Sequence, residues 1–147
     1  MAEALFNNDP VLEHLPYKVV ASSAGISAVK GEKASLQARR LLREEGITDL
    51  EKHFSRSVTK EIVDDADIIL VMTGEQLQGL TAPFPHLSAK TFTLKGFVSL
   101  DRENPDIGDP LGGDLEKYRE VLEEIRSCIK KVMVKLMKGR ERKGCGE

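Results

Sequence analysis

The apolar run Ile68–Met72 is the feature that most restricts how this chain can fold. It contains no polar position, and it is bounded by Asp67 on one side and by Thr73-Gly74 on the other. A run this short and this uniformly apolar is typical of a strand in a parallel sheet that helices cover on both faces. Parallel strands need long crossover connections, so the run predicts helices before and after it.

Helical patterns do flank this run. Residues 34–45 carry an apolar stripe on one face, and Gly46 supplies the stop signal after it. Thr59 has the character of an N-cap for a short helix behind it. The longest pattern begins at Leu115, and its apolar positions recur every three or four residues as far as Leu136.

Further segments complete an alternating order. Residues 18–23 and 90–94 predict short strands, and the second of these is rich in strand-forming threonine and phenylalanine. Residues 1–6 predict a helix that the Asp9-Pro10 pair ends before a loop, and residues 75–80 predict another short helix. Strands that alternate with helices indicate an α/β domain with a parallel sheet and right-handed crossovers.

Composition narrows the possible partners and compartment. The 147 residues are 40% hydrophobic with a net charge of −2, which indicates one domain, residues 1–138, without general attraction to nucleic acid or to a membrane surface. The basic, glycine-broken residues 139–147 predict a disordered tail. Cys128 and Cys145 lack the spacing of a metal site or a disulfide framework, so we expect no metal and a cytoplasmic location.

The stretch from Asp106 to Asp114 is the main candidate for chemistry. Pro110 fixes its own φ and keeps Asp109 out of the helical region, while neighbouring glycines allow close approach of a ligand. A carboxyl group held in this way can act as a general acid. The alternative is a turn that ends one element and caps the next. Because ligands of open α/β sheets bind beyond the carboxyl ends of strands, residues 23–31 and 72–74 are further candidates.

A series of short segments also has a recognisable order and spacing. They are Met1-Ala2-Glu3-Ala4, Ser23-Ala24-Gly25, Gly46-Ile47, His53-Phe54-Ser55-Arg56, Val58-Thr59, Ala66-Asp67, Val71-Met72-Thr73, Phe92-Thr93-Leu94-Lys95, and Asp109-Pro110 with Gly112-Gly113. Together they resemble the low-molecular-weight protein phosphatases, which include tyrosine phosphatases and bacterial protein-arginine phosphatases. The resemblance implies a three-layer α/β/α fold with a parallel four-stranded sheet. It also implies a monomer that uses no cofactor and hydrolyses phosphorylated proteins or small phosphoesters through a cysteinyl-phosphate intermediate.

The resemblance also implies roles for individual residues. Asp109 matches the general acid, which later acts as the base that activates water, and Ser23 and His53 match a buried pair that supports the phosphate loop. Leu111 and Val29 match the two cleft walls where tyrosine-specific members place aromatic residues. Neither side chain can stack on a phenol ring, which favours another phosphoresidue such as phosphoarginine. The choice between tyrosine and arginine stays open, because the family sets it largely inside the phosphate loop.

One part of the family pattern is absent from these residues. The family places Cys, five residues and Arg-Ser directly before the helix that begins like Met1-Ala2-Glu3-Ala4. Cys128 is followed six positions later by Val134, and Cys145 has only two residues after it, so neither matches the nucleophile. Our hypothesis is that Met1 is an internal methionine, that a first central strand and the phosphate loop lie upstream, and that the chain as written is inactive.

Other interpretations of the sequence lead to different functions. A non-catalytic phosphatase-like remnant or interaction module would keep the fold without the nucleophile. An arsenate reductase on the same fold would need redox cysteines downstream of the phosphate loop, and none lies between Met1 and Ser127. An α/β domain of unrelated function is the remaining alternative, since a fold does not imply a function.

Overall fold

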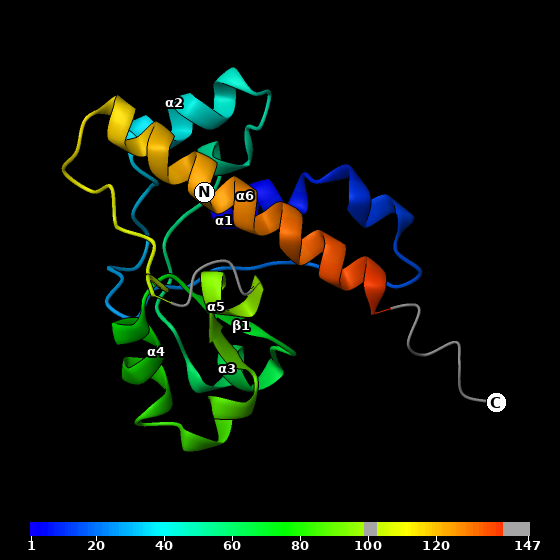
Figure 1. Cartoon of the computed structure of the whole chain (residues 1–147). Coiled ribbons are helices and arrows are strands. Elements are labelled where there is room, and N and C mark those ends of the chain that lie inside the picture. Colours follow the sequence, from blue (N-terminus) through cyan, green and yellow to red (C-terminus); the bar gives the residue numbers. More distant parts are fainter. Residues whose placement is uncertain (99–102, 140–147) are drawn as a thin grey trace.

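The computed structural model describes residues 1–98 and 103–139 of the chain. Figure 1 shows the long helix α6, Leu115–Lys138, running across the molecule together with α1, Ala2–Asn7, and α2, Leu36–Glu44. The sheet lies below α6 in this view, together with α3, Lys60–Asp65, α4, Gly74–Thr81, and α5, Leu94–Val98. The fold is thus an arrangement of helices α1, α2 and α6 over a small α/β unit.

The sheet in the described residues has two parallel strands. Strand β1 comprises Ile69–Val71 and strand β2 comprises Thr91–Thr93, with Leu70 opposite Phe92. The connection between them contains α4, Gly74–Thr81, and a 3-10 helix, as a parallel pair requires. The other short helices are α3, Lys60–Asp65, and α5, Leu94–Val98, and the 3-10 helices are Pro10–His14, Asp49–Glu51 and Pro85–Ala89.

Local side chains explain where several helices begin. Ser35, Thr59, Thr73 and Asp114 each precede a helix and accept a hydrogen bond from a backbone N–H of its first turn. These bonds satisfy donors that have no partner within the helix. The C-terminal end of α2 is followed by Gly46 at φ +79°, a conformation that glycine adopts without steric cost.

Helix α6 supplies one side of the main core. Its buried stripe consists of Tyr118, Val121, Leu122, Ile125, Cys128, Ile129, Val132 and Met133. This stripe packs chiefly against α1, α2 and α5 and meets Leu5, Leu42 and Leu94 in one hydrophobic cluster. A smaller cluster of Val63, Leu80 and Leu87 joins α3, α4 and the following 3-10 helix. The fold thus has two separate hydrophobic clusters, a main one around α6 and a smaller one that joins α3 to α4.

Most predicted elements are confirmed, but the strand predicted at residues 18–23 is wrong. The structure assigns no strand to these residues, and the only bridge near them pairs Gly25 with Ser57. At Ala21 a side chain takes the place of a neighbouring strand: Asn7 Nδ2 donates to Ala21 O at 2.8 Å, and Ala21 N–H donates to Asn7 Oδ1 at 2.9 Å.

Three smaller features concern the burial of β1, the packing of α6 and the end of α1. Strand β1 is only half-buried, and Ile68 before it is 46% exposed, so helices do not cover both faces fully. The stripe of α6 packs mainly on the helices α1, α2 and α5 rather than on the sheet. The Asp9-Pro10 pair ends α1 as predicted, but a 3-10 helix follows it, because Asp9 Oδ1 accepts the N–H of Val11.

The last two points are the predicted tail and the possibility of a membrane-spanning helix. The predicted tail, residues 139–147, lies outside the described residues except for Gly139. Within residues 1–98 and 103–139, no helix is both long enough and apolar enough to cross a membrane.

Candidate active site

The loop that carries Asp109 is attached to the carboxyl end of β1. The Ile107 N–H donates to Met72 O at 2.8 Å, and the Gly74 N–H donates to Asp106 Oδ1 at 2.8 Å. The Ile107 side chain is 2% exposed in the main core. The loop is therefore fixed at the sheet edge where ligands of α/β folds bind.

Asp109 itself projects from this anchored loop with its side chain exposed. Its Oδ1 accepts the Leu111 N–H at 2.9 Å, and the Pro110 between them is buried. Gly112 follows at φ +82° and turns the chain toward the Asp114 N-cap of α6. The local turn predicted from sequence is thus present, and it holds a solvent-accessible carboxyl group that can exchange protons with a ligand.

The structure brings Ser23 and His53 together through a third residue, Glu3. The Ser23 hydroxyl donates to Glu3 Oε2, and His53 Nδ1 lies 3.9 Å from Glu3 Oε1. Arg56 Nε also donates to Ser23 O at 2.9 Å. The pair is less buried than the resemblance implies, because Ser23 is exposed and the His53 side chain is 28% exposed.

Glu3 was not among the residues predicted for the site. Its position in the first turn of α1 suits an acidic residue at the positive end of a helix, but neither this nor its place in Met1-Ala2-Glu3-Ala4 indicates contacts with Ser23 or His53. Its contacts across 20 residues to Ser23 and across 50 residues to His53 arise only when α1 folds against these loops. The predicted support pair is therefore part of a three-residue cluster.

The predicted cleft walls are both exposed apolar side chains. Leu111 is 76% exposed on the Asp109 loop, and Val29 is 66% exposed on the loop that follows residues 18–23. Val29 is held by its backbone, since the Ser55 hydroxyl donates to Val29 O. That the two side chains form opposite walls of one cleft stays a prediction.

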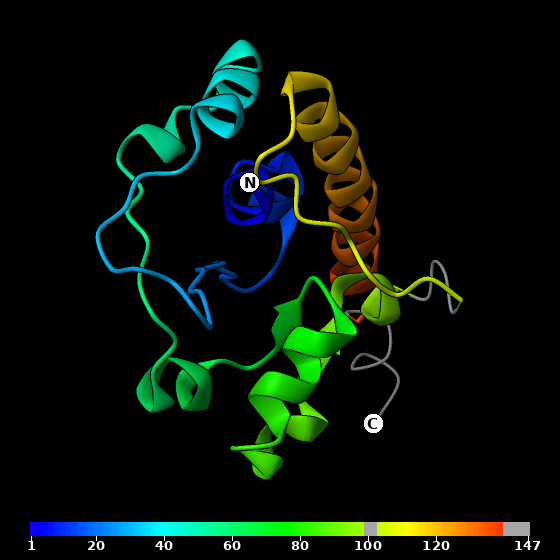
Figure 2. The ribbon, with the colours of Figure 1, turned by 90° about the vertical axis from the view of Figure 1, so that its left-hand side faces the viewer.

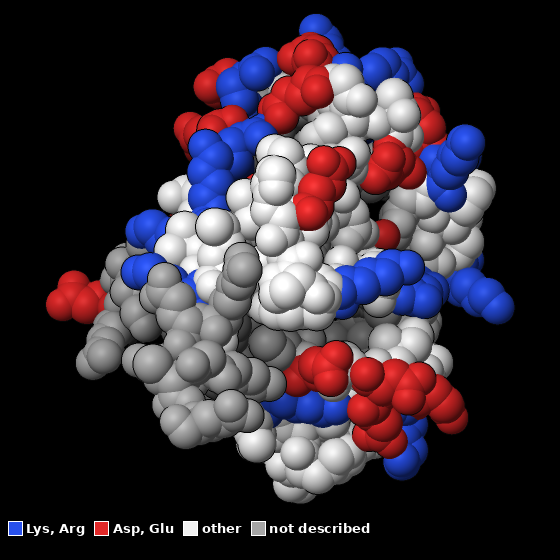
Figure 3. Space-filling view, turned by 90° about the vertical axis from the view of Figure 1, so that its right-hand side faces the viewer, with Lys and Arg blue, Asp and Glu red and all other residues white. Residues whose placement is uncertain are grey.

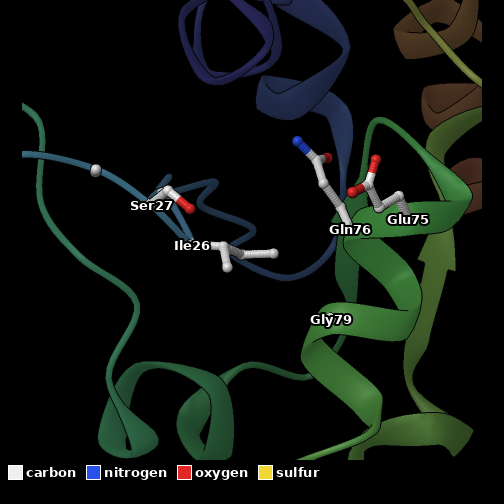
Figure 4. Close-up of a pocket in the computed structure, with 7 residues that line it drawn as sticks. Ile26, Ser27, Glu75, Gln76 and Gly79 are labelled. Carbon is white, nitrogen blue, oxygen red and sulfur yellow. The ribbon is translucent and has the colours of Figure 1, made fainter.

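A cavity of about 410 Å³ lies between this loop and α4. Gly25, Ile26, Ser27 and Ala28 line one side, and Glu75, Gln76 and Gly79 line the other. Figure 4 shows Ile26 extending from the loop into the gap, with Gln76 and Glu75 on the helix across from it. Gln76 Oε1 accepts the Met72 N–H at 2.9 Å, which ties the cavity wall to the same strand end as Asp109.

Sequence reasoning did not single out Glu75 or Gln76. Both belong to the first turn of α4, directly after the strand end that was predicted as a site segment. Their position on the cavity wall depends on how α4 packs against the loop of residues 25–28. The spacing of apolar residues in the sequence does not specify that packing. The anchored carboxyl loop and the α4 wall of the cavity thus lie at the same end of β1.

The cysteine that the structure describes is not suited to nucleophilic attack. Cys128 is a free thiol that is 1% exposed on α6, and burial raises its pKa above the usual range. A raised pKa disfavours the thiolate, which is the reactive form. Cys145 lies outside the described residues. Residues 1–98 and 103–139 contain no group of three or more His, Cys, Asp or Glu residues that could hold a metal ion.

The parallel α/β frame is the fold class that the resemblance to the phosphatases implies. The model of the family described as Low molecular weight phosphotyrosine protein phosphatase matches residues 1–142. The chain therefore belongs to the low molecular weight protein phosphatase family, and the predicted family and α/β fold class are confirmed.

Individual relatives agree with this assignment. A protein-arginine-phosphatase of Geobacillus stearothermophilus is 39% identical over 92% of this chain and 86% of that protein. The solved YwlE arginine phosphatase of the same organism is 37% identical with a TM-score of 0.84, covering 96% of this chain and 86% of the other. A YwlE mutant with a serine in place of cysteine, phosphorylated at that active-site serine, is 33% identical with a TM-score of 0.83, covering 95% and 88%.

Proposed function

We propose that residues 1–147 provide the general acid and the substrate walls of a protein phosphatase that cleaves phosphoarginine or phosphotyrosine in proteins. The supporting observation is the attachment of the Asp109 loop to the end of β1 by the Ile107 and Asp106 hydrogen bonds. These bonds hold one exposed carboxyl group at the ligand-binding edge of the sheet. A fixed carboxyl group is what proton transfer to a leaving group needs.

The proposed reaction has two steps at phosphorus. In the first, a cysteine thiolate attacks the phosphorus atom, the bond to the leaving oxygen or nitrogen breaks with its electron pair, and protonated Asp109 gives its proton to that atom. In the second, a water molecule attacks the cysteinyl phosphate, Asp109 accepts a proton from this water, and the thiolate leaves. Inorganic phosphate and the thiolate are then free.

The thiolate itself is not assigned to Cys128 or Cys145. Neither cysteine begins a segment of Cys, five residues and Arg, and Cys128 is buried. We therefore propose that residues 1–147 alone do not hydrolyse phosphoesters, and that the thiolate and phosphate loop have to be joined ahead of Met1. Helix α1 would then follow the phosphate loop, so that its N-terminal end faces the bound anion.

Phosphoarginine is the substrate that the walls favour. Val29 and Leu111 are aliphatic and cannot give a phenol ring the ~0.5–1.5 kcal/mol that aromatic stacking contributes. Relatives that are 39% and 32% identical are named protein-arginine-phosphatases. We propose that the enzyme works as a cytoplasmic monomer on phosphorylated proteins, without binding nucleic acid or membranes, in keeping with its net charge of −2.

A chimera tests these proposals. It joins the N-terminal segment of the G. stearothermophilus arginine phosphatase, up to the residue aligned with Met1, to residues 1–147. We expect the chimera to hydrolyse p-nitrophenyl phosphate and to prefer a phosphoarginine peptide over a phosphotyrosine peptide in kcat/KM. A chimera with serine in place of the grafted cysteine is the control for contaminating phosphatase. An inactive but folded chimera would contradict the proposed function, and a preference for phosphotyrosine would contradict the substrate assignment.

A further inference from the structure

Two loops far apart in sequence are joined into one structural unit beside the cavity. The Gly31 N–H donates to Ser55 O at 2.8 Å, and the Ser55 N–H donates to Glu32 O at 2.7 Å. Side chains add to this ladder, because Ser57 Oγ donates to Ala28 O at 3.1 Å. Figure 2 shows residues 25–33 and 53–58 on the side of the molecule away from α6. We call this unit the paired loops, residues 25–33 and 53–58.

The paired loops present apolar side chains to solvent. Phe54 is 53% exposed and Val29 is 66% exposed, although their backbones are held by hydrogen bonds. Phe54 is paired with Lys33 in an antiparallel bridge, and Lys33 Nζ lies 6.0 Å from the centre of the Phe54 ring. An aromatic ring held in place on the surface loses little conformational entropy on binding, and aromatic residues are enriched in interfaces.

The charges around Phe54 differ from those elsewhere on the molecule. Lys30, Lys33, Lys52 and Arg56 lie on or next to the paired loops, and in the described chain none of them forms an ion pair. Glu32 is the single carboxylate within residues 25–33 and 53–58, and Glu3 lies 3.9 Å from His53 at their edge. Unpaired cations on a protein with a net charge of −2 leave a local positive field that attracts an anionic partner.

The arginines of α2 and α6 show the contrast. Arg39, Arg40, Arg43, Arg119 and Arg126 are each paired with a glutamate. In Figure 3 acidic and basic side chains alternate near the top of the molecule, at the height of α2 in Figure 1. Cations neutralised in this way have little attraction left for a partner. The paired loops are therefore a distinct positive and apolar surface.

We propose that Lys33 and Phe54 form a second recognition surface, which binds the stretch of substrate protein next to the phosphorylated residue. The fitting segment has an apolar side chain for Phe54 and acidic side chains for Lys33 and its neighbours. The surface is continuous with the cavity, because Ile26 and Ala28 of the same loop line that cavity. The proposal rests on the proposed function for the identity of its partner, a phosphorylated protein.

Binding of unphosphorylated peptides to the 147-residue chain tests this surface without requiring catalysis. The probe is a ten-residue peptide of alternating aspartate and leucine with Gly-Ser ends, titrated into isotopically labelled protein and followed by amide NMR shifts. We expect shifts concentrated in residues 25–33 and 53–58. Control peptides replace every aspartate by lysine or every leucine by serine, and each should bind at least about fivefold more weakly.

Variants locate the contact. Phe54→Ser and Lys33→Gln should each raise Kd for the aspartate-leucine peptide about five- to tenfold, the range expected for an interface residue of moderate importance. Val134→Ser and Lys131→Gln are matched controls, since both side chains are exposed on α6, and should leave Kd unchanged. The amide spectra of the variants report whether the fold is retained.

Several outcomes would overturn the proposal. They are equal binding of the lysine peptide, shifts confined to other regions, Kd values unaffected by Phe54→Ser, and tighter binding to anionic lipid vesicles or single-stranded RNA than to the peptide. Failure of the chimera to hydrolyse phosphoesters is a separate result. It would remove the proposed function while leaving the measured peptide site in place.

Discussion

Gly74 and Asp106 are joined by a 2.8 Å hydrogen bond in which the backbone N–H at the start of α4 donates to a carboxylate oxygen three residues before Asp109. The acceptor therefore ties the acid-bearing loop to the first turn of the helix that lines the cavity. Its neighbour Ile107 adds the bond to Met72 O. The position of Asp109 is thus set by contacts from two consecutive residues to the end of β1.

Replacing Asp106 should misplace the acid without removing it. In the chimera, Asp106→Ala should lower kcat on a phosphoarginine peptide by ~10- to 100-fold, because small displacements of a catalytic group are costly. Asp106→Asn keeps an oxygen that can accept the Gly74 N–H and should restore most of the activity. Steady-state kinetics of the three proteins measure this. Equal losses in the alanine and asparagine variants would mean that the hydrogen bond does not position the loop.

Asp109 itself should act on the leaving group. Asp109→Asn in the chimera should lower kcat by ~10²–10⁴-fold on a substrate with a poor leaving group, because the amide cannot donate the proton in the transition state. Vanadate should still bind, since it needs the phosphate loop and not the acid. Inhibition constants and kcat for aryl phosphates of graded leaving-group pKa measure both effects. An unchanged kcat on the poorest leaving group would contradict the role of Asp109.

How much of this fold the sequence predicted depends on how local each signal was. Signals that depend on a few neighbouring residues were predictable. They include the N-cap at Thr59 and the apolar stripe of the helix that follows Asp114. The segment 18–23 has the composition of a strand, yet its Ala21 backbone groups are bonded by the Asn7 side chain. Composition cannot show whether a neighbouring strand is present to complete the pairing.

The site residues also differ in whether their signal in the sequence is local or long-range. Asp109 was found because Pro110 and the glycines around it restrict the local backbone. Ser23 and His53 came from the resemblance alone, and the residue that joins them, Glu3, was missed because its contacts are long-range. Gln76 was missed for the same reason: its amide reaches the cavity only when α4 packs beside the loop of residues 25–28.

Asp64 should make stability depend on pH in the acid range. Lys60 and His86 hold the pKa of the Asp64 carboxyl at about 2, below its ordinary 3.8, by hydrogen bonds and charge. Because the folded-state pKa is depressed, this contribution is present above pH 3.8 and is lost as the pH falls through 3.8 toward 2. Asp64→Asn should therefore flatten the fall of Tm over that interval. Asp65→Asn is the matched control, as no ion pair joins Asp65 to another described residue, and an equal effect of both variants would contradict the assignment.

The final prediction compares a buried leucine with an ion pair at the contact between α2 and α6. Leu42 is 0% exposed in the main core, whereas Arg126 of α6 pairs with Glu45 at the end of α2 and with Glu123 on its own helix. Leu42→Ala should lower the free energy of unfolding by ~2–5 kcal/mol, since it removes buried apolar contacts and leaves a cavity. Arg126→Met should cost less than about 1 kcal/mol, because ion pairs that stay partly open to solvent are screened and entropically costly.

Urea denaturation at low and high salt distinguishes the two contributions. The loss for Arg126→Met should shrink further at 1 M salt, where the Debye length is about 3 Å, while the loss for Leu42→Ala should persist. Lys117→Met is the matched control for Arg126, since its partner Glu120 lies on the same helix and the pair joins no second element among the described residues. If Arg126→Met cost as much as Leu42→Ala, ion pairs between the helices, and not apolar packing, would be the main attachment of α2 to α6.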